Sequence, residues 1–430
     1  MAQAPTPPPA GLRPDWDPAP GSRRRWLILA VGALGFLLSM FHRVSVAVIS
    51  TSLADELGLD RVQLGEISAA FYYAFGAGQV PVGLALDRIG PRWTMTILAG
   101  VAVGGIVIFA LAQTPGQLIA ARALVGLGMS ANFMGILAVM AVWFPVNRFA
   151  FLMGSLSALG VSGNVLAATP LALLAEALGW RTSFMLIAGL NALVALLFFL
   201  VARDRPPGAA PLARSGAELW AGLGRLARLP GFWIISFMTF FRYGFMAAVQ
   251  SLWAAPYLVY GLGLSQLEAA NAIFCIGLGY MIGLPFFGRL SDRWLSTRKW
   301  VILPGVAVFA LLCLAAAGLR QIPPRWLVMA WFLSLGLASA PGQIAYAHIK
   351  ELAPPAMAAQ AMTAINLWTM MGAAILSQFL GLFLAGEPAS LRGPESFALM
   401  WQVGAAGLGT SALLYFLVPE SPVINRGRKQ

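Results

Sequence analysis

Long apolar runs, separated by short polar segments, fill the chain between residues 26 and 418. A helix rises 1.5 Å per residue, so about twenty apolar residues cross the roughly 30 Å hydrocarbon core of a bilayer. Glycine and proline interrupt many of these runs, which membrane helices tolerate and which argues against a barrel of alternating strands. The predicted fold class is therefore an all-α integral membrane protein with twelve transmembrane helices, at residues 26–50, 62–84, 93–112, 117–143, 149–175, 182–202, 231–256, 266–288, 299–318, 325–350, 356–385 and 394–418.

Composition supports a lipid environment for most of the chain. Of its 430 residues 59% are hydrophobic and 10% are charged, whereas a soluble domain carries about 25% charged residues. The net charge of +12 does not indicate nucleic-acid binding, because the basic residues are scattered between apolar runs and form no contiguous surface. Cys275 and Cys313 both lie inside apolar segments, so neither a disulfide nor a metal site is expected.

The distribution of basic residues between alternate loops predicts the orientation. With the N-terminus in the cytoplasm, inside segments carry 20 Lys and Arg residues and outside loops carry 5, as the positive-inside rule requires. Both termini are thus expected on the cytoplasmic side of the cell inner membrane. The predicted organisation is a disordered tail at 1–25, a six-helix half at 26–202, a cytoplasmic linker at 203–230, a second six-helix half at 231–418 and a tail at 419–430.

An internal repeat relates the two halves at an offset of 205 residues. Gly58-Leu59 matches Gly263-Leu264, Gly78 matches Gly283, and "GLALDR" (83–88) matches "GRLSDR" (288–293). Each charged turn follows the second span of its half. Such repeats are typical of secondary transporters, in which two halves rock about a central site.

These motifs resemble those of the major facilitator superfamily. The G-x-x-x-D-R-x-G-x-R turn after the second span is similar to its signature loop, and "RALVGLG" (122–128) resembles its R-x-x-x-G-x-G pattern in the fourth span. The resemblance covers all twelve spans and implies a monomeric carrier that works by alternating access around a central cavity. It also implies a cytoplasmic gate, in which the glycines allow close helix packing and the aspartates accept from backbone N–H groups at another helix N-terminus. The candidate gate residues are Gly83, Asp87, Arg88, Arg92, Gly288, Asp292 and Arg293.

Three arginines lie inside predicted spans, namely Arg43, Arg122 and Arg242. A charged residue at the centre of a membrane helix costs roughly 2.5–3.5 kcal/mol or more, so each indicates a functional site. No Asp or Glu lies deep in a span, and arginine does not lose its proton in proteins. A negatively charged substrate would supply the missing counter-charge.

Arg43 in the first span and Arg242 in the seventh also resemble the arginine pair of the organophosphate:phosphate antiporters and of organic-anion carriers. Gln79 stands where the glycerol-phosphate carriers have a lysine, which favours a carboxylate over a phosphate ester. Polar residues that could also line the cavity are Tyr73, Asn132, Asn164, Gln250, Gln343, Tyr346, Asn366 and Gln378. Each of these could equally join helices to one another.

His42 and Arg122 are candidates for coupling transport to protons. His42 could titrate or could be a hydrogen-bonded packing residue, while Arg122 belongs to a superfamily motif and could be structural. His348, next to Lys350 and Glu351, is interpreted as a residue at the edge of a loop. No phosphate-binding loop, catalytic triad or metal-ligand spacing stands out, so we expect no enzyme, cofactor or metal.

The sequence thus predicts a secondary active transporter for a small organic anion, working by proton symport or by anion exchange. A drug/proton efflux carrier of the same fold is one alternative, although such exporters generally need a buried carboxylate. A transporter-like anion sensor is another. The expected partners are the organic anion, the lipid bilayer and, for a symporter, protons.

Overall fold

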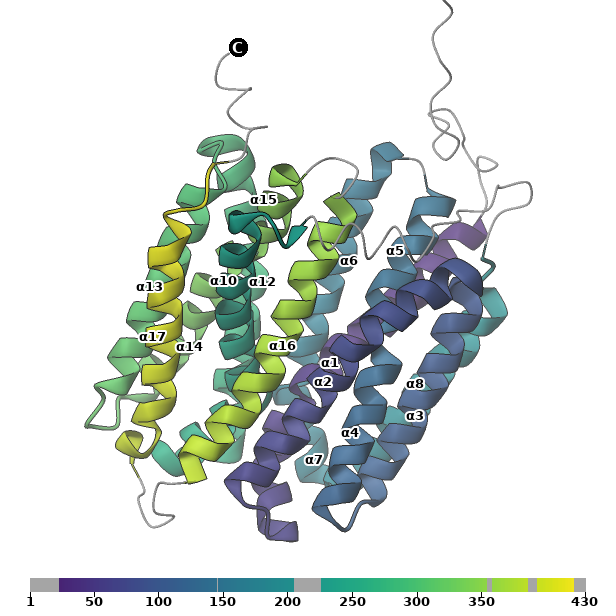
Figure 1. Cartoon of the computed structure of the whole chain (residues 1–430). Coiled ribbons are helices and arrows are strands. Elements are labelled where there is room, and N and C mark those ends of the chain that lie inside the picture. Colours follow the sequence, from purple (N-terminus) through teal and green to yellow (C-terminus); the bar gives the residue numbers. More distant parts are fainter. Residues whose placement is uncertain (1–22, 145, 205–225, 354–357, 386–392, 421–430) are drawn as a thin grey trace, which may run out of the picture.

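The computed structural model describes residues 23–144, 146–204, 226–353, 358–385 and 393–420 (Figure 1). Within these ranges the regular structure is helical and contains no strand. Eleven of the described helices are long and apolar enough to cross a membrane, and the predicted span 62–84 also forms one continuous helix, α2, of 28 residues. The all-α membrane fold is therefore confirmed.

The first half contains eight helices for its six predicted spans. The fourth span divides into two helices at Ser130, and the fifth divides at Ala167 and Ala168. α1 includes the last three residues of the predicted N-terminal tail. The helices are α1 (Arg23–Leu57), α2 (Arg61–Arg88), α3 (Pro91–Leu111), α4 (Pro115–Met129), α5 (Ala131–Trp143), α6 (Val146–Leu166), α7 (Thr169–Leu178) and α8 (Trp180–Val201).

The second half is more irregular. Its seventh span includes two π-helical stretches, η1 and η2, and its tenth contains a 3₁₀ turn, η4. The elements are α10 (Pro230–Ala248), η1 (Val249–Trp253), α11 (Ala254–Pro256), η2 (Tyr257–Gly261), α12 (Gln266–Arg289), η3 (Leu290–Trp294), α13 (Lys299–Ala317), α14 (Arg325–Ser339), η4 (Ala340–Ile344), α15 (Ala345–Leu352), α16 (Ala358–Ala385), η6 (Pro394–Phe397) and α17 (Ala398–Tyr415).

The 205-residue repeat is visible in the backbone where α2 and α12 begin. Gly58 and Gly263 both adopt positive φ angles, 62° and 66°, which a residue without a Cβ adopts at little cost. Two residues later, Asp60 caps α2 in a capping box with Gln63, and Ser265 caps α12 in a capping box with Glu268. Both capping pairs obey the same offset although their residue types differ.

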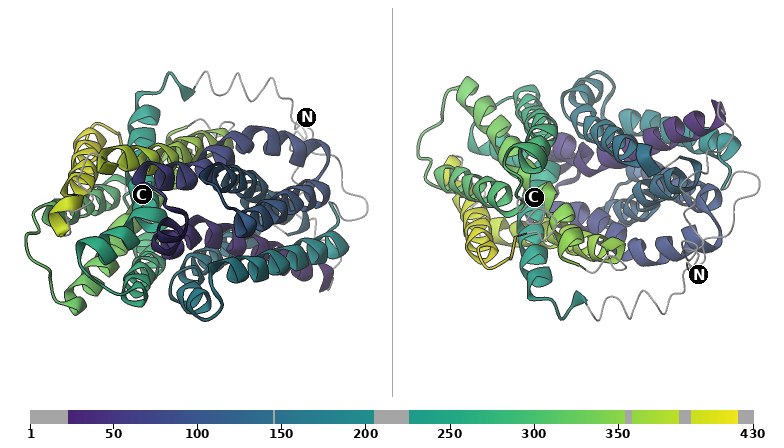
Figure 2. Two further views of the ribbon diagram at one scale, coloured as in Figure 1. Left: turned by 90° about the horizontal axis from the view of Figure 1, so that it is seen from below. Right: turned by 90° about the horizontal axis from the view of Figure 1, so that it is seen from above.

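The two halves lie side by side in the end-on views of Figure 2. They meet chiefly where α2 packs along α16, where α6 and α7 pack against α12, and where α1 packs against η1 and α11. We call the end where α1 begins and α17 ends the termini end, and the opposite end the far end; the termini end is uppermost in Figure 1. Hydrogen bonds between the halves gather from mid-bundle to the far end, and include Ser68 with Ser251 at 3.3 Å and Thr169 with Asn271 at 2.8 Å.

The prediction of close helix packing at Gly83 and Gly288 is wrong for this conformation. A Cβ built on either glycine would meet no atom within 4 Å in the part of the chain that is described. The close crossings occur one to two turns earlier, because a Cβ on Gly78 would lie 2.8 Å from Ser130 Oγ, and one on Gly283 would lie 2.6 Å from Ala340 Cβ.

Candidate anion site

Arg43 reaches from α1 in the first half to α10 in the second. Its Nη1 donates a 2.6 Å hydrogen bond to the hydroxyl of Tyr243, and its guanidinium lies 4.7 Å from the centroid of the Phe75 ring. The Tyr72 hydroxyl donates to the main-chain oxygen of Arg43 at 3.4 Å. Arg43 is 7% exposed, and its Nε is buried without a hydrogen-bond partner.

Arg242 precedes Tyr243 in α10 and is fully buried, with an exposed fraction of 0%. None of its three guanidinium nitrogens forms a well-aligned hydrogen bond within the part of the chain that the structure describes. The Tyr280 phenol interacts electrostatically with both Arg242 and Arg43, and so does that of Tyr346. The two arginines therefore share one group of tyrosines.

A small cavity lies between the halves at this point, with a volume of about 30 Å³. Its polar lining comes from both halves. Among these residues, Asn164 Oδ1 and Ser339 Oγ are buried without a hydrogen-bond partner. The lining residues are Arg43, Val44, Tyr72, Asn164, Tyr243, Met246, Ala247, Gln250, Ile276, Tyr280 and Ser339.

Among the described residues that line this cavity only Arg43 is charged, and none is acidic. A buried hydrogen-bonding group without a partner costs about 1–3 kcal/mol, and more when it is charged. The orphaned guanidinium nitrogens of Arg43 and Arg242 can thus be satisfied by a bound oxyanion or by water. Guanidinium groups suit carboxylate, sulfonate and phosphate oxygens because they can donate two parallel bonds.

Several residues predicted to line this cavity lie elsewhere. Tyr73 is placed between α2 and α16, where its hydroxyl donates to Gln378 at 3.0 Å. Asn132 lines a separate cavity inside the first half, between α1, α3, α4, α5 and α8. Asn366 accepts from Tyr346 at 2.9 Å, and Gln343 accepts from Tyr280 at 3.0 Å. Gln343 thus supports a tyrosine of the cavity, whereas Asn366 holds Tyr346, which is not among the lining residues either.

Four polar lining residues were missed from the sequence, namely Tyr72, Tyr243, Tyr280 and Ser339. Tyr73 was predicted to line the cavity, but its neighbour Tyr72 does so instead. Adjacent residues of a helix point about 100° apart, so the two tyrosines face different neighbours. Ser68 and Phe75 lie on the same side of α2 as Tyr72 and also face the second half or Arg43. A helix-wheel comparison within α2 could therefore have identified Tyr72.

His42 and Arg122 face the interior of the first half, away from the cavity. His42 Nε2 lies 3.3 Å from Asn191 Nδ2 in α8, and Arg122 Nη1 donates to the main-chain oxygen of His42 at 3.0 Å. The Arg122 guanidinium also lies 4.5 Å from the Phe71 ring centroid. His348, interpreted from sequence as a loop-edge residue, is instead fully buried and bonded to Tyr415 at 2.8 Å.

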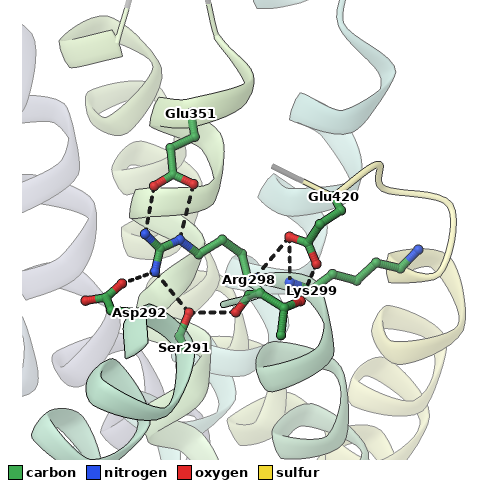
Figure 3. A network of polar contacts seen from close by, with 7 residues as sticks. Ser291, Asp292, Arg298, Lys299, Glu351 and Glu420 are labelled. Atoms are coloured by element: carbon green, nitrogen blue, oxygen red, sulfur yellow. Dashed lines mark hydrogen bonds and ion pairs between the residues drawn. The ribbon is translucent and has the colours of Figure 1, made fainter. Parts of the chain in front are cut away.

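A charged network occupies the termini end of the second half (Figure 3). Arg298 donates two hydrogen bonds to Glu351, at 2.8 and 3.2 Å, and also forms an ion pair with Asp292. Burial alone would lower the pKa of Arg298, but the hydrogen bonds to Glu351 and Asp292 raise it above its ordinary value. Asp292 therefore binds a side chain here, and not the backbone N–H groups expected from the sequence.

That capping role belongs to Glu420, which follows α17. Its Oε1 accepts from the backbone N–H of Arg298 at 3.0 Å, where α13 begins. The first half repeats the arrangement, because Asp204 follows α8 and accepts from the backbone N–H of Arg92 at 2.7 Å, where α3 begins. Arg92 also donates to the main-chain oxygen of Phe199 at 2.9 Å. Of the remaining gate candidates, Arg88 and Arg293 are exposed, and the Asp87 side chain lies outside the described structure.

A profile of the Major Facilitator Superfamily matches residues 31–375, and a second match covers residues 235–430. Together the two matches take in all twelve spans and both arginines of the cavity. The chain belongs to the Major Facilitator Superfamily. This member is thus a multi-span membrane transporter and not an enzyme.

Named relatives of this superfamily member confirm its resemblance to organic-anion carriers. It is 25% identical over 290 residues to the probable sulfoacetate transporter SauU of Cupriavidus necator, a match that covers 63% of this chain and 66% of that protein. It is 23% identical to the probable galactarate/D-glucarate transporter GudP of Escherichia coli, over 77% of this chain and 80% of that one.

A solved structure supports the fold independently. A bacterial homolog of the human lysosomal transporter Spinster, in an inward-facing and unoccupied conformation, matches with a TM-score of 0.70 at 17% sequence identity. The match covers 93% of this chain and 97% of that chain.

Proposed function

We propose that this transporter carries a small organic anion, held between Arg43 and Arg242, across the inner membrane by alternating access. The observation that carries the proposal is the pair of buried guanidiniums, one from each half, beside a cavity whose lining includes no carboxylate. Relatives named for the transport of sulfoacetate and of galactarate or D-glucarate support an anionic cargo.

The electrostatics favour an anion that contacts both halves. Two permanent positive charges inside a membrane protein are costly when unpaired, so an anion that neutralises both is stabilised and draws α1 and α10 together. The Tyr243 hydroxyl provides Arg43 with one oxygen partner. An anion that enters the cavity would add acceptors for the nitrogens that still lack one.

A carboxylate or sulfonate suits the site better than a phosphate ester. Gln79, which stands in place of a lysine, is 8% exposed, and its amide donates to the main-chain oxygens of Ser130 at 3.3 Å and of Phe75 at 3.4 Å. It therefore adds no third cation to the cavity. Both proton symport and anion exchange are compatible with this site.

The hydrogen bonds at the far end support an assignment of this conformation as inward-facing. If both termini are cytoplasmic, as the distribution of basic residues predicts, the far end is periplasmic. The bonds of Ser68 with Ser251 and of Thr169 with Asn271 then close the periplasmic side. The same bonds would have to break each time the carrier opens outward.

Thermal unfolding of the purified protein tests the proposal against a panel of sulfoacetate, D-glucarate, nitrate and the cation tetraphenylphosphonium. An anion at 100 times its dissociation constant should stabilise the wild type by about 2.7 kcal/mol, and R43Q and R242Q should abolish that stabilisation. R181Q is the matched control, because Arg181 is paired with Glu56 away from the cavity.

Three results would count against the proposal. Stabilisation by tetraphenylphosphonium alone, unaffected by R43Q and R242Q, would favour the efflux alternative. Equal anion binding by the wild type and both variants would place the site elsewhere. Anion binding without uptake or exchange of the labelled anion in proteoliposomes would favour the sensor alternative.

A further inference from the structure

The break in the tenth span lies directly against Arg242. α14 ends at Ser339, the 3₁₀ turn η4 follows, and Pro341 and Gly342 are both buried within it. A Cβ added to Gly342 would lie 2.4 Å from Arg242 Nε, 2.8 Å from its Cδ and 3.0 Å from its Cζ. These distances are below van der Waals contact, so the guanidinium occupies the space that any side chain at position 342 would need.

Few directional contacts fix this guanidinium. Arginine has a long side chain with many rotamers, and hydrogen bonds normally select one of them when the group is buried. None of the Arg242 nitrogens has a well-aligned hydrogen bond within the described residues, although the Tyr280 phenol lies close enough to interact with the guanidinium. Steric contact with the backbone of η4 is therefore a second local restraint on where the charge lies.

We propose that Gly342 is a positioning residue of the anion site, whose missing side chain sets the place of the Arg242 guanidinium. This inference rests on the proposed function, because it assigns Gly342 a role through the second cation of that site. The atoms that an added Cβ would meet belong to a flexible side chain and not to backbone. A methyl group at position 342 should therefore displace the guanidinium and leave the helix break in place.

Gly305 offers a matched control at the same break. A Cβ on Gly305, in α13, would lie 2.5 Å from Pro341 Cγ and 2.8 Å from its Cβ. G305A therefore crowds the neighbouring residue of η4, and no atom of Arg242 is among the three nearest to the added Cβ. A general sensitivity of the tenth span would appear in both variants, whereas displacement of the arginine would appear only in G342A.

The first measurement is the dissociation constant of sulfoacetate for the purified wild type, G342A and G305A. G342A should weaken binding by about tenfold or more, the loss expected when one charge-assisted hydrogen bond is misplaced, and G305A should bind within about twofold of the wild type. Unchanged affinity in G342A, or an equal loss in G305A, would overturn the inference while leaving the two-arginine site intact.

The second measurement needs no anion and separates this inference from the proposed function. The melting temperatures of G342A and wild type are compared, and so are those of G342A/R242A and R242A. Shortening Arg242 removes the atoms that the new Cβ would meet, so any loss in G342A should vanish in the R242A background. An equal loss in both backgrounds would show that Gly342 acts on the helix break itself, whether or not sulfoacetate proves to be a ligand.

Discussion

Gly126, in the R-x-x-x-G-x-G motif of α4, packs against the backbone of α2. A Cβ at this position would lie 2.1 Å from the main-chain oxygen of Phe71, 2.8 Å from its carbonyl carbon and 2.9 Å from its Cα. To reach an ordinary contact distance of 3.4 Å, the two helices would have to separate by roughly 1.3 Å. Backbone atoms cannot rotate out of the way, so we expect G126A to strain the whole crossing.

The size of the effect follows from comparison with Gly104 in α3. A Cβ on Gly104 would meet no described atom within 4 Å, so G104A should gain only the helix propensity of alanine over glycine, about 1 kcal/mol. G126A gains the same propensity but also incurs overpacking, which costs about 1–3 kcal/mol. The difference in unfolding free energy between the two variants should therefore be about 1–3 kcal/mol, and close to the upper limit.

Reversible unfolding of both variants in detergent, by denaturant or by heat, measures this difference. G126A should also weaken the bond from Arg122 to the main-chain oxygen of His42, because Arg122 lies one turn earlier in α4. If G126A proved as stable as G104A, the α2 and α4 backbones could not be as close as the structure places them.

Two further predictions concern the ends of the bundle. D204A and E420A each remove a carboxylate that accepts a backbone N–H at a helix start, and each should lose about 0.5–2 kcal/mol of stability in thermal unfolding. D292A removes a mostly exposed carboxylate and leaves Arg298 paired with Glu351, so it should lose less. The double variant S68C/S251C should form a disulfide across the far end, because the two serine hydroxyl oxygens are 3.3 Å apart. The disulfide should stop transport in proteoliposomes until a reductant is added. Full transport by the cross-linked protein would show that this end need not open.

The number of membrane spans and the internal repeat could be predicted from the sequence because both depend on the local pattern of residues. Apolar length specifies the spans, and Gly58 and Gly263 mark equivalent turns. The breaks at Ser130 and in η4 (Ala340–Ile344) could not be predicted, because membrane helices tolerate glycine and proline without breaking. Those breaks depend on neighbouring helices, as the contact between η4 and Arg242 shows.

For the site, the sequence predicted the charges better than their surroundings. Arg43 and Arg242 stood out because a cation in a membrane span is costly, and the structure places both beside one group of tyrosines. Tyr72 and Tyr280 did not stand out, because a tyrosine in a membrane helix is common and its direction depends on how the helices pack. The caps of α3 and α13 were missed for a related reason, since Asp204 and Glu420 act on residues more than 100 positions away.

The lack of acidic residues in the cavity lining has a consequence for how acidity would affect this carrier. Guanidinium groups keep their proton throughout the physiological range, so the charge that Arg43 presents to the cavity, and the charge that Arg242 holds beside it, are the same in acidic and alkaline surroundings. A cargo acid, by contrast, loses its negative charge when the medium becomes more acidic than its own pKa. The lowest pH at which the cargo is recognised is therefore set by the pKa of the cargo acid. Strong acids such as sulfonates would be recognised at any pH that cells encounter.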